Sequence, residues 1–413
     1  MLKLAELVLN LFSSEKFYYF LLRFDTSIGI ASESIRLALV KSKIEKMKVT
    51  FLRCKVPCGH LIFSSKYPSE IYSSIDSENI RKEFVCVELF LSYYYGIKFL
   101  IFSVLLSIVK MKKVLYAQYL YGHENIYFPA VFPRGTYEYG AWARVARSVR
   151  AFPSVQLSGN GALLFRRNMV ELGIENGWYV CLHIRSSHFY NDNAYYRNGS
   201  IENYYRAIDL IINSGGIVVR LGDAVDGFIT KPRRNLVDYP NTRYKSEFMD
   251  LHLIQNCKFY FGTQSGMIDM ALLFKKPVLS VNSIHFSISG AGKYDTTIYK
   301  RVYDKSSKRF LSFSEMMSLF GYFSTVSFDE FSSRYEWIEN SSQEIYDAAV
   351  EIISKIESLG GKSTAMQMAA QRKLKKNTLK RNAISDTNTL PLVLAQAVFS
   401  RVIIGRKYLE DLS

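Results

Sequence analysis

Cysteine is scarce in this 413-residue sequence, and its spacing follows no metal-binding pattern. The cysteines are odd in number and lie in apolar surroundings, which predicts reduced core residues in a cytosolic protein. Cys54, Cys58 and His60 could begin a zinc site, but no second pair with ligand spacing exists, so we expect no metal. The five cysteines are Cys54, Cys58, Cys86, Cys181 and Cys257.

Several other signatures are missing. No Gly-x-Gly-x-x-Gly follows a candidate strand, which argues against a dehydrogenase. Helix-turn-helix, zinc-finger and RNP-type patterns are absent, so we expect no nucleic-acid partner. Met1 to Phe12 is apolar but short and lacks a small-residue cleavage site, so no secretory signal is predicted. The lack of a secretory signal and the reduced cysteines favour a cytoplasmic location.

Acidic residues are also in deficit, because 53 lysines and arginines face 37 aspartates and glutamates. The formal net charge of +16 implies an anionic partner, such as a nucleotide, a phospholipid surface or an acidic glycan. Part of the excess is local: Lys362 to Arg381 carries seven basic residues and no acidic one. We expect this basic tail to contact an anionic membrane peripherally.

One apolar segment, Leu89 to Val109, is long enough to span a membrane. It is 21 residues long, with Lys98 near its middle as its only charge. Its first half is made polar by Ser92 and the three tyrosines that follow. The pattern favours a buried or membrane-surface helix over a span.

An apolar run of strand length, Trp178 to Arg185, ends in a histidine and an arginine. Three more candidate strands follow, at Gly216 to Leu221, Cys257 to Phe261 and Pro277 to Val281, with helical stretches between them. This alternation predicts an α/β fold with a parallel, doubly wound sheet. Arg185 then lies at the carboxyl end of a buried strand, where such sheets bind ligands.

The helices between these strands have recognisable starts and stops. Ser200 and Ser246 can each cap a helix, and Gly215-Gly216 ends the first of them. Gly262-Thr-Gln-Ser-Gly266 leads from the third strand into an apolar helix, Met267 to Phe274. A glycine-rich turn before a helix presents free backbone N–H groups and the positive end of the helix dipole. A phosphate or a sugar hydroxyl suits that corner.

The chain divides into two domains near residue 160. Phe20 to Phe24 and a helical stretch at Ala31 to Val40 indicate the start of another α/β domain. Pro153 to Gly161 is the expected hinge, and Ala162 to Leu172 a helix leading into the second sheet. We therefore predict an N-terminal domain at 1–160, a ligand-binding domain at 161–355, and C-terminal helices at 356–413.

The C-terminal part of the chain contains two further helical signals. Ser341 to Glu344 forms a capping box that opens an apolar-faced helix. A final apolar stretch, Leu390 to Leu409, is expected to pack back onto the body.

An ordered series of motifs within residues 160–355 resembles a family of bacterial glycosyltransferases found in surface-polysaccharide gene clusters. That family is distantly similar to the fucosyltransferase-like branch of the GT-B fold. The resemblance implies two Rossmann-like domains facing a cleft, with a C-terminal helical tail. The motifs are His183-Ile-Arg185, Arg197-Asn198, Ile201-Glu-Asn-Tyr, Gly215 to Asp223, Lys245-Ser246 with Asp250, and Phe261-Gly-Thr-Gln-Ser-Gly266.

The resemblance implies that the 161–355 domain holds a nucleotide sugar and the N-terminal domain holds a glycan or lipid-linked acceptor. Arg185 would stabilise the departing nucleoside diphosphate by bidentate bonds, without a metal ion or other cofactor. The glycine-rich loop would add N–H groups, and Thr263 and Ser265 would add hydroxyls. The implied donor-binding residues are His183, Arg185, Arg220, Gly222, Asp223, Ser246, Asp250, Gly262, Thr263, Ser265 and Gly266.

The N-terminal half departs from the family pattern. Family members carry a Gly-His pair in the first loop, where this chain has Gly29-Ile30. Asp25 and Glu33 flank that loop, and Asp25 is our candidate for the general base. The missing histidine suggests an altered acceptor or a weakened enzyme.

Plainer interpretations exist for several of these residues. Arg185 could form a strand-end ion pair, and His183 could orient the loop by hydrogen bonds. Asp223 could shape a turn beside Gly222, and Ser246 could only cap a helix.

Two other functions remain open: a sugar-nucleotide epimerase of the GT-B fold, and a non-catalytic glycan- or membrane-binding subunit. The epimerase would need more acidic residues in the cleft for proton abstraction. The binding subunit is compatible with Ile30 and the basic tail. A glycosyltransferase, moving a hexosyl or deoxyhexosyl group, explains the strand-end arginine, the glycine-rich corner and the two-domain division together.

Overall fold

The structure is a computed structural model in which part of the chain is described. In the N-terminal half these residues are 17–22, 32, 36, 48–53, 75–76, 80–82, 114–117 and 155–157. In the C-terminal half they are 161–175, 177–186, 195–224, 229, 231–284, 292–320, 332–358, 363–381 and 404–412. The predictions for Asp25, Gly29-Ile30, Glu33, residues 54–60, residue 86 and residues 89–109 lie outside the described residues.

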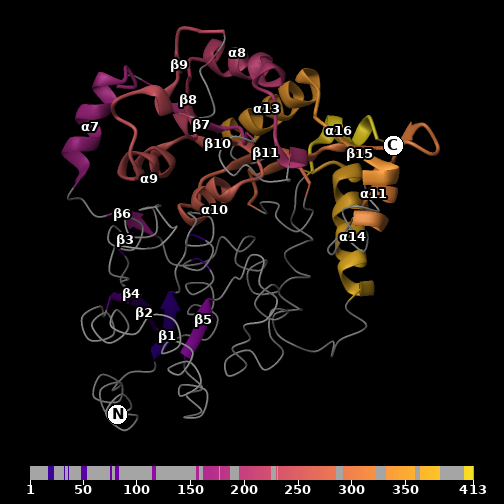
Figure 1. Ribbon diagram of the computed structural model, residues 1–413, viewed down its shortest axis with the longest axis horizontal. Coiled ribbons are helices and arrows are strands. Elements are labelled where there is room, and N and C mark those ends of the chain that lie inside the picture. Colours follow the sequence, from indigo (N-terminus) through magenta and orange to yellow (C-terminus); the bar gives the residue numbers. More distant parts are fainter. Residues whose placement is uncertain are drawn as a thin grey trace.

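The C-terminal half is built on a six-stranded sheet in which every neighbouring pair of strands is parallel. The central strands are apolar and buried along their length, as expected when helices cover both faces. This confirms the predicted parallel α/β sheet (Figure 1). The strands are β7 (Tyr179–His183), β8 (Ile217–Leu221), β9 (Leu236–Val237), β10 (Phe259–Thr263), β11 (Val278–Ser283) and β12 (Thr296–Tyr299).

The strand order across the sheet is β12-β11-β10-β7-β8-β9. The chain therefore starts in the middle at β7, builds outward to β9, returns to β10 and builds outward in the other direction. In a doubly wound sheet the order reverses at such a point, and ligands bind at the carboxyl ends of the two strands that flank it. Here those strands are β7 and β10.

Helices cover both faces of this sheet, with α8 and α13 on one side and α9 and α10 on the other (Figure 1). The predicted helix after Ser200 begins as a 3-10 turn, η3 (Ile201–Tyr204), and continues as α8. The predicted helices starting at residues 162 and 267 are confirmed as α7 and α10. The bounds are α7 (Ala162–Glu171), α8 (Tyr205–Asn213), α9 (Glu247–Asn256), α10 (Gly266–Leu273) and α13 (Ser342–Glu357).

The helix starts follow local hydrogen-bond chemistry. Ser246 caps α9 by accepting from the Met249 N–H at 3.2 Å. The predicted capping box is present at α13, where Ser341 accepts from the Glu344 N–H and Glu344 accepts from the Ser341 N–H. Ser200 precedes η3 but makes no capping bond with its side chain. Its hydroxyl bonds Glu202 instead.

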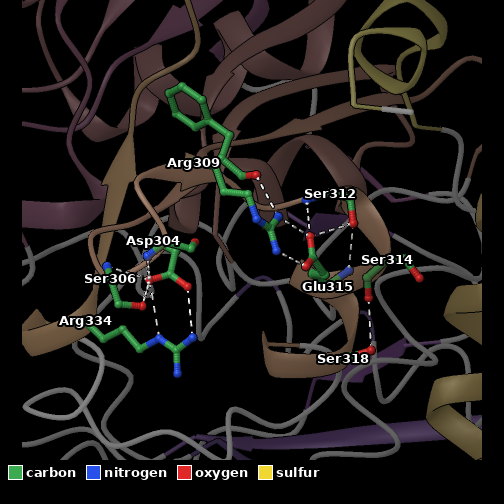
Figure 2. A network of polar contacts seen from close by, with 10 residues as sticks. Asp304, Ser306, Arg309, Ser312, Ser314, Glu315, Ser318 and Arg334 are labelled. Carbon is green, nitrogen blue, oxygen red and sulfur yellow. Dashed lines mark hydrogen bonds and ion pairs between the residues drawn. The ribbon is translucent and has the colours of Figure 1, made fainter.

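A small antiparallel sheet, which the sequence did not suggest, extends the domain beyond β12. Its order is β14-β13-β15, and α11 (Phe313–Phe320) follows β14. Figure 2 shows the polar contacts that fix its turns: Arg334 bonds Asp304, and Arg309 bonds Glu315 at the start of α11. The Arg309 guanidinium, followed by hydrogen bonds from Ser312, lowers the pKa of Glu315 to about 2. The strands are β13 (Arg301–Asp304), β14 (Arg309–Phe310) and β15 (Tyr335–Ile338).

The N-terminal half contains a second parallel sheet, in the order β4-β2-β1-β5. Its first strand begins at Phe17, three residues before the predicted run, and Ser32 and Arg36 are helical, as predicted for residues 31–40. A short antiparallel pair joins β3 (Ile75–Asp76) to β6 (Gln156–Leu157), and β6 lies within the predicted hinge region. The strands are β1 (Phe17–Leu22), β2 (Lys48–Arg53), β4 (Ile80–Lys82) and β5 (Val114–Ala117).

Residues 404–412 pack back onto the C-terminal sheet, as predicted for the end of the apolar stretch. Ile404 bridges in parallel to Thr297 of β12, and the Gly405 N–H donates to the Thr297 carbonyl at 3.0 Å. Gly405 precedes α16 (Arg406–Glu410), and a Cβ at Gly405 would lie 2.6 Å from Ile298 Cγ2. This close approach needs glycine. Among the described residues beyond 358, the chain forms α16 and the basic α14 (Ala365–Arg381).

Cys181 and Cys257 are buried free thiols, as predicted. Burial raises the pKa of Cys181 well above its usual value, so it stays protonated. Within the ranges given above, no helix is long and apolar enough to cross a bilayer.

Candidate active site

Arg185 lies two residues beyond the end of β7, at the point where the strand order reverses. Its residue exposure is only 5%. Its backbone N–H donates to Thr263 Oγ1 of β10 at 2.8 Å, and its guanidinium donates to Asn198 Oδ1 at 2.5 Å. The sequence predicted the position of this guanidinium. Its partner Asn198 comes from a segment that returns over the strand ends.

Residues 195–200 form that returning segment. The Gly199 N–H donates to the Arg185 carbonyl at 3.1 Å, and the Arg197 guanidinium donates to the Gln264 carbonyl at 3.4 Å. A Cβ at Gly199 would lie 3.2 Å from the Thr263 methyl, so the segment passes close over β10. It therefore brings Arg197 to the loop after β10, at the same strand ends as Arg185.

His183 contacts the glycine-rich loop directly. Its Nδ1 lies 3.1 Å from Ser265 Oγ, which in turn lies 3.3 Å from the Tyr260 hydroxyl. Ser265 precedes α10 and makes no capping bond with its side chain, because its hydroxyl faces His183. This geometry fits the loop-orienting interpretation of His183, and it places Ser265 in that role as well.

Gly262 allows β10 to approach β7 at this corner. Its φ of +155° is a conformation that side-chain-bearing residues avoid, and a Cβ there would lie 1.9 Å from the His183 carbonyl oxygen. Gly266 begins α10, whose first N–H groups point toward the same edge. The fold thus brings Arg185 together with the glycine-rich loop and the start of α10, as the sequence predicted.

An acidic group also lies in the first turn of α10. Asp269 is buried, and the guanidinium of Arg36, a buried residue of the N-terminal half, lies 4.0 Å from it. The ion pair offsets the negative charge of Asp269 near the helix start.

Arg220, Gly222 and Asp223 lie at the end of β8, next to β7. Arg220 is buried and pairs with Asp238, which follows β9. Asp238 also accepts from the Ile229 N–H and from Asn241 Nδ2. Gly222 has a φ of +124°, and Asp223 beyond it is half-buried. Arg220 lies within β8, whereas Asp223 lies beyond its carboxyl end.

Ser246 and Asp250 lie at the start of α9, after β9. Ser246 is the helix cap described above. Asp250 is fully buried and forms an ion pair with Lys245. Its carboxylate is therefore held inside the domain.

Lys300 and Glu339 are polar residues of this edge that sequence reasoning missed. Lys300 follows β12 directly, and its Nζ donates to the Asn198 carbonyl at 2.7 Å. Glu339 accepts from the Ser200 N–H at 2.9 Å and from Asn203 Nδ2 at 3.3 Å. A lysine ending the run Thr-Thr-Ile-Tyr was the available signal for Lys300.

A surface hollow of about 360 Å³ lies elsewhere, between α8 and α13. It is lined by helix residues and the turn after α8, including Arg206, Asp209 and Tyr346. Arg206 bonds Gln343, and Asp209 bonds Arg233. Both charged side chains of the hollow therefore already have partners in the protein. We place the site at the strand ends. In the described ranges, no group of three or more His, Cys, Asp or Glu side chains could hold a metal ion.

Comparisons with known proteins give only remote similarities. No protein-family model and no curated protein matches this sequence. Among solved structures, the iron-containing dodecameric glycosyltransferase TibC of enterotoxigenic E. coli is 12% identical, with a TM-score of 0.35, over 64% of this chain and 57% of that one. The ADP-heptose lipopolysaccharide heptosyltransferase II of E. coli gives 12% identity and a TM-score of 0.35, over 64% and 84%.

A third structure, the family 9 glycosyl transferase of Veillonella parvula, is 9% identical with a TM-score of 0.36, over 64% of this chain and 80% of that one. TM-scores this low carry no argument about fold or activity. The function proposed below therefore rests on this chain's own residues.

Proposed function

We propose that this chain is a glycosyltransferase that binds a nucleotide-sugar donor at the carboxyl ends of β7 and β10. The observation that carries the proposal is the buried guanidinium of Arg185 at the point where the strand order reverses. A fixed, buried cation at this point suits a diphosphate better than a neutral ligand. The likeness to surface-polysaccharide enzymes of fucosyltransferase-like type stays a prediction.

The reaction breaks the bond between the sugar and the diphosphate, and negative charge develops on the leaving phosphate. Arg185 would meet that charge with its guanidinium, and the start of α10 would add backbone N–H groups from Gly266 onward. Such fixed donors need no reorganisation as the bond breaks. The proposed reaction therefore uses no metal ion.

Other groups are assigned by their place along the edge. Gly222 and Asp223 follow β8, and Asp223 would accept hydrogen bonds from the ribose or base. The N-terminal half would hold a glycan or lipid-linked acceptor across a GT-B-like cleft, with Asp25 as the proposed general base. The transferred group is proposed to be a hexosyl or deoxyhexosyl unit.

The test is a thermal-shift screen of the protein against GDP, UDP, ADP, dTDP and CMP and their sugars. We expect one nucleotide to raise the melting temperature, because a ligand that binds only the folded state stabilises it. Arg185→Lys, which keeps the charge but loses the bidentate geometry, should weaken binding about 30-fold. Exposed Arg206 on α8 provides the matched control, and Arg206→Lys should bind like the native protein. No shift with any nucleotide would overturn the proposal.

We also propose a peripheral contact with anionic membrane through α14. This helix has six basic residues from Arg372 to Arg381 and no acidic one, and it lies at one side of the domain in Figure 1, apart from the six-stranded sheet. Basic residues near an anionic surface contribute about 1 kcal/mol each. An inner-membrane location would bring the site to a lipid-linked acceptor.

Sedimentation with anionic vesicles at low salt checks this contact. The native protein should sediment, and Arg372→Glu with Lys373→Glu should reduce its partition coefficient about tenfold or more. The same charge change on α7, Arg166→Glu with Arg167→Glu, uses equally exposed residues and should have little effect. Equal losses in both double variants would point to net charge rather than α14.

A further inference from the structure

Lys300 is a buried ammonium at the carboxyl end of β12. Only 3% of the residue is exposed. Its backbone N–H donates to the Ser283 carbonyl at 2.8 Å, which fixes its main chain beside the end of β11. Its side chain reaches back toward the middle of the sheet, where Nζ donates to the Asn198 carbonyl at 2.7 Å. The charge is thus held near Arg185, with Asn198 between the two cations.

The charge of Lys300 is poorly matched by its surroundings. Its ammonium has three N–H donors, and the hydrogen bond to Asn198 is the one that it makes within the described residues. No carboxylate of the described chain lies within ion-pair distance of Nζ. The carboxylate of Glu339 acts on Lys300 electrostatically, but it is already held by Ser200 and Asn203. A buried ammonium with open donors is costly unless an anion joins it.

Lys355 shows what a satisfied buried lysine looks like in the same fold. It is 7% exposed, and its Nζ donates to Thr296 Oγ1 at 2.8 Å and pairs with Glu351 at 2.7 Å. Lys355 bonds Thr296 at the start of β12, whereas Lys300 follows the end of β12. The two lysines therefore lie at opposite ends of the strand. Lys355 has its counter-ion, Glu351, in the protein. Lys300 lies at the proposed ligand-binding strand ends and has no counter-ion among the described residues.

We propose that Lys300 binds the sugar-side phosphate of the donor, next to Arg185. The strand order supports this assignment, which rests on the proposed function. Asp223 follows β8 on one side of β7, and Lys300 follows β12 on the other side of β10. A nucleotide whose base and ribose lie toward β8 would cross Arg185 and extend its second phosphate toward Lys300. The ligand class is therefore a nucleoside diphosphate, and a monophosphate would not reach.

A pH effect follows from the same geometry. Burial lowers the pKa of Lys300 to about 8, with Glu339 opposing the shift. Of its other neighbours, Tyr204 stays neutral because burial raises its pKa. A bound phosphate favours the protonated amine, so above pH 8 binding must take up a proton. Affinity then falls as pH rises, by up to about tenfold per pH unit.

Titration calorimetry at pH 7.5 and 9.5 tests the proposal, with GDP, UDP, ADP and dTDP, their monophosphates, and inorganic pyrophosphate as probes. Lys300→Met should weaken diphosphate and pyrophosphate binding about tenfold or more at pH 7.5 and leave monophosphate affinity unchanged. It should also abolish the loss of nucleoside-diphosphate affinity between the two pH values. Lys300→Arg should retain affinity and lose the pH dependence, because arginine does not titrate there.

Lys355→Met is the matched control for loss of a buried lysine, and it should lower stability without changing phosphate affinity. Equal diphosphate affinity in the native protein and Lys300→Met would overturn the assignment of Lys300 and leave the proposed function standing. Pyrophosphate binding that depends on Lys300, with no nucleotide bound, would keep the anion site and overturn the proposed function. Failure of the native protein to bind any of these probes would overturn both.

Discussion

Gly262→Ala is expected to lower the free energy of unfolding by about 4 kcal/mol, combining backbone strain with a steric clash. The added methyl group would lie 1.9 Å from the His183 carbonyl oxygen, and backbone atoms cannot move aside as a flexible side chain can. β7 and β10 would have to separate where Arg185 and Thr263 are hydrogen-bonded. Nucleotide binding should weaken together with stability. Urea unfolding curves measure the loss.

Gly215→Ala separates the two causes. Gly215 also has a positive φ, +82°, but a Cβ there meets no atom within 4 Å. It should therefore cost only the strain of a left-handed residue, about 1 kcal/mol. If the two alanine variants were equally stable, the close approach of β10 to β7 would be wrong.

Breaking the ion pair between Arg220 and Asp238 is expected to cost about 3 kcal/mol, because it leaves a half-buried carboxylate without its counter-ion. The side chains are 8% and 22% exposed. Asp238 also holds the Ile229 and Asn241 positions, so Arg220→Met should loosen the loops after β8 and β9. Chemical denaturation of Arg220→Met reports the size of the effect.

The pair of Arg309 and Glu315 is the matched surface case. Its side chains are 53% and 39% exposed, so Arg309→Met should cost less than about 1 kcal/mol.

Nucleotide affinity then decides the role of Arg220, which the motif series assigned to the donor-binding site. Unchanged affinity in the folded Arg220→Met protein would make the arginine structural. A tenfold loss or more would place it in the donor site.

The sequence predicted the C-terminal sheet well where its signals were local. The four apolar runs became β7, β8, β10 and β11 with shifts of one or two residues, because continuous apolar strands between helix caps are typical of a sheet buried on both faces. β9 was missed because it has two residues, and β12 because its two threonines carry no apolar pattern. The antiparallel β14-β13-β15 sheet depends on pairing between distant segments.

The candidate site divides in the same way. Arg185 was placed correctly because its position follows from the end of one strand. The ion pair that holds Arg220 joins two strands, and no spacing rule links it to Asp238. Lys300 reaches Asn198 only because residues 195–200 return across the ends of three strands. Side-chain chemistry at one position was therefore predictable, and partnerships across the sheet were not.

The pairing of Ile404 with β12 has a consequence for how this half of the chain is made. Thr297 lies on the last strand of the sheet, and it pairs at the outer edge with Ile404, a residue that the ribosome adds much later. Until residue 404 has been synthesised, that edge presents open N–H and C=O groups, which are prone to pair with another chain. Domains usually fold as their sequence emerges. In this sheet, the pairing of Thr297 with Ile404 can form only after residue 404 has been made. We therefore expect the risk of aggregation through this edge to be greatest before that point.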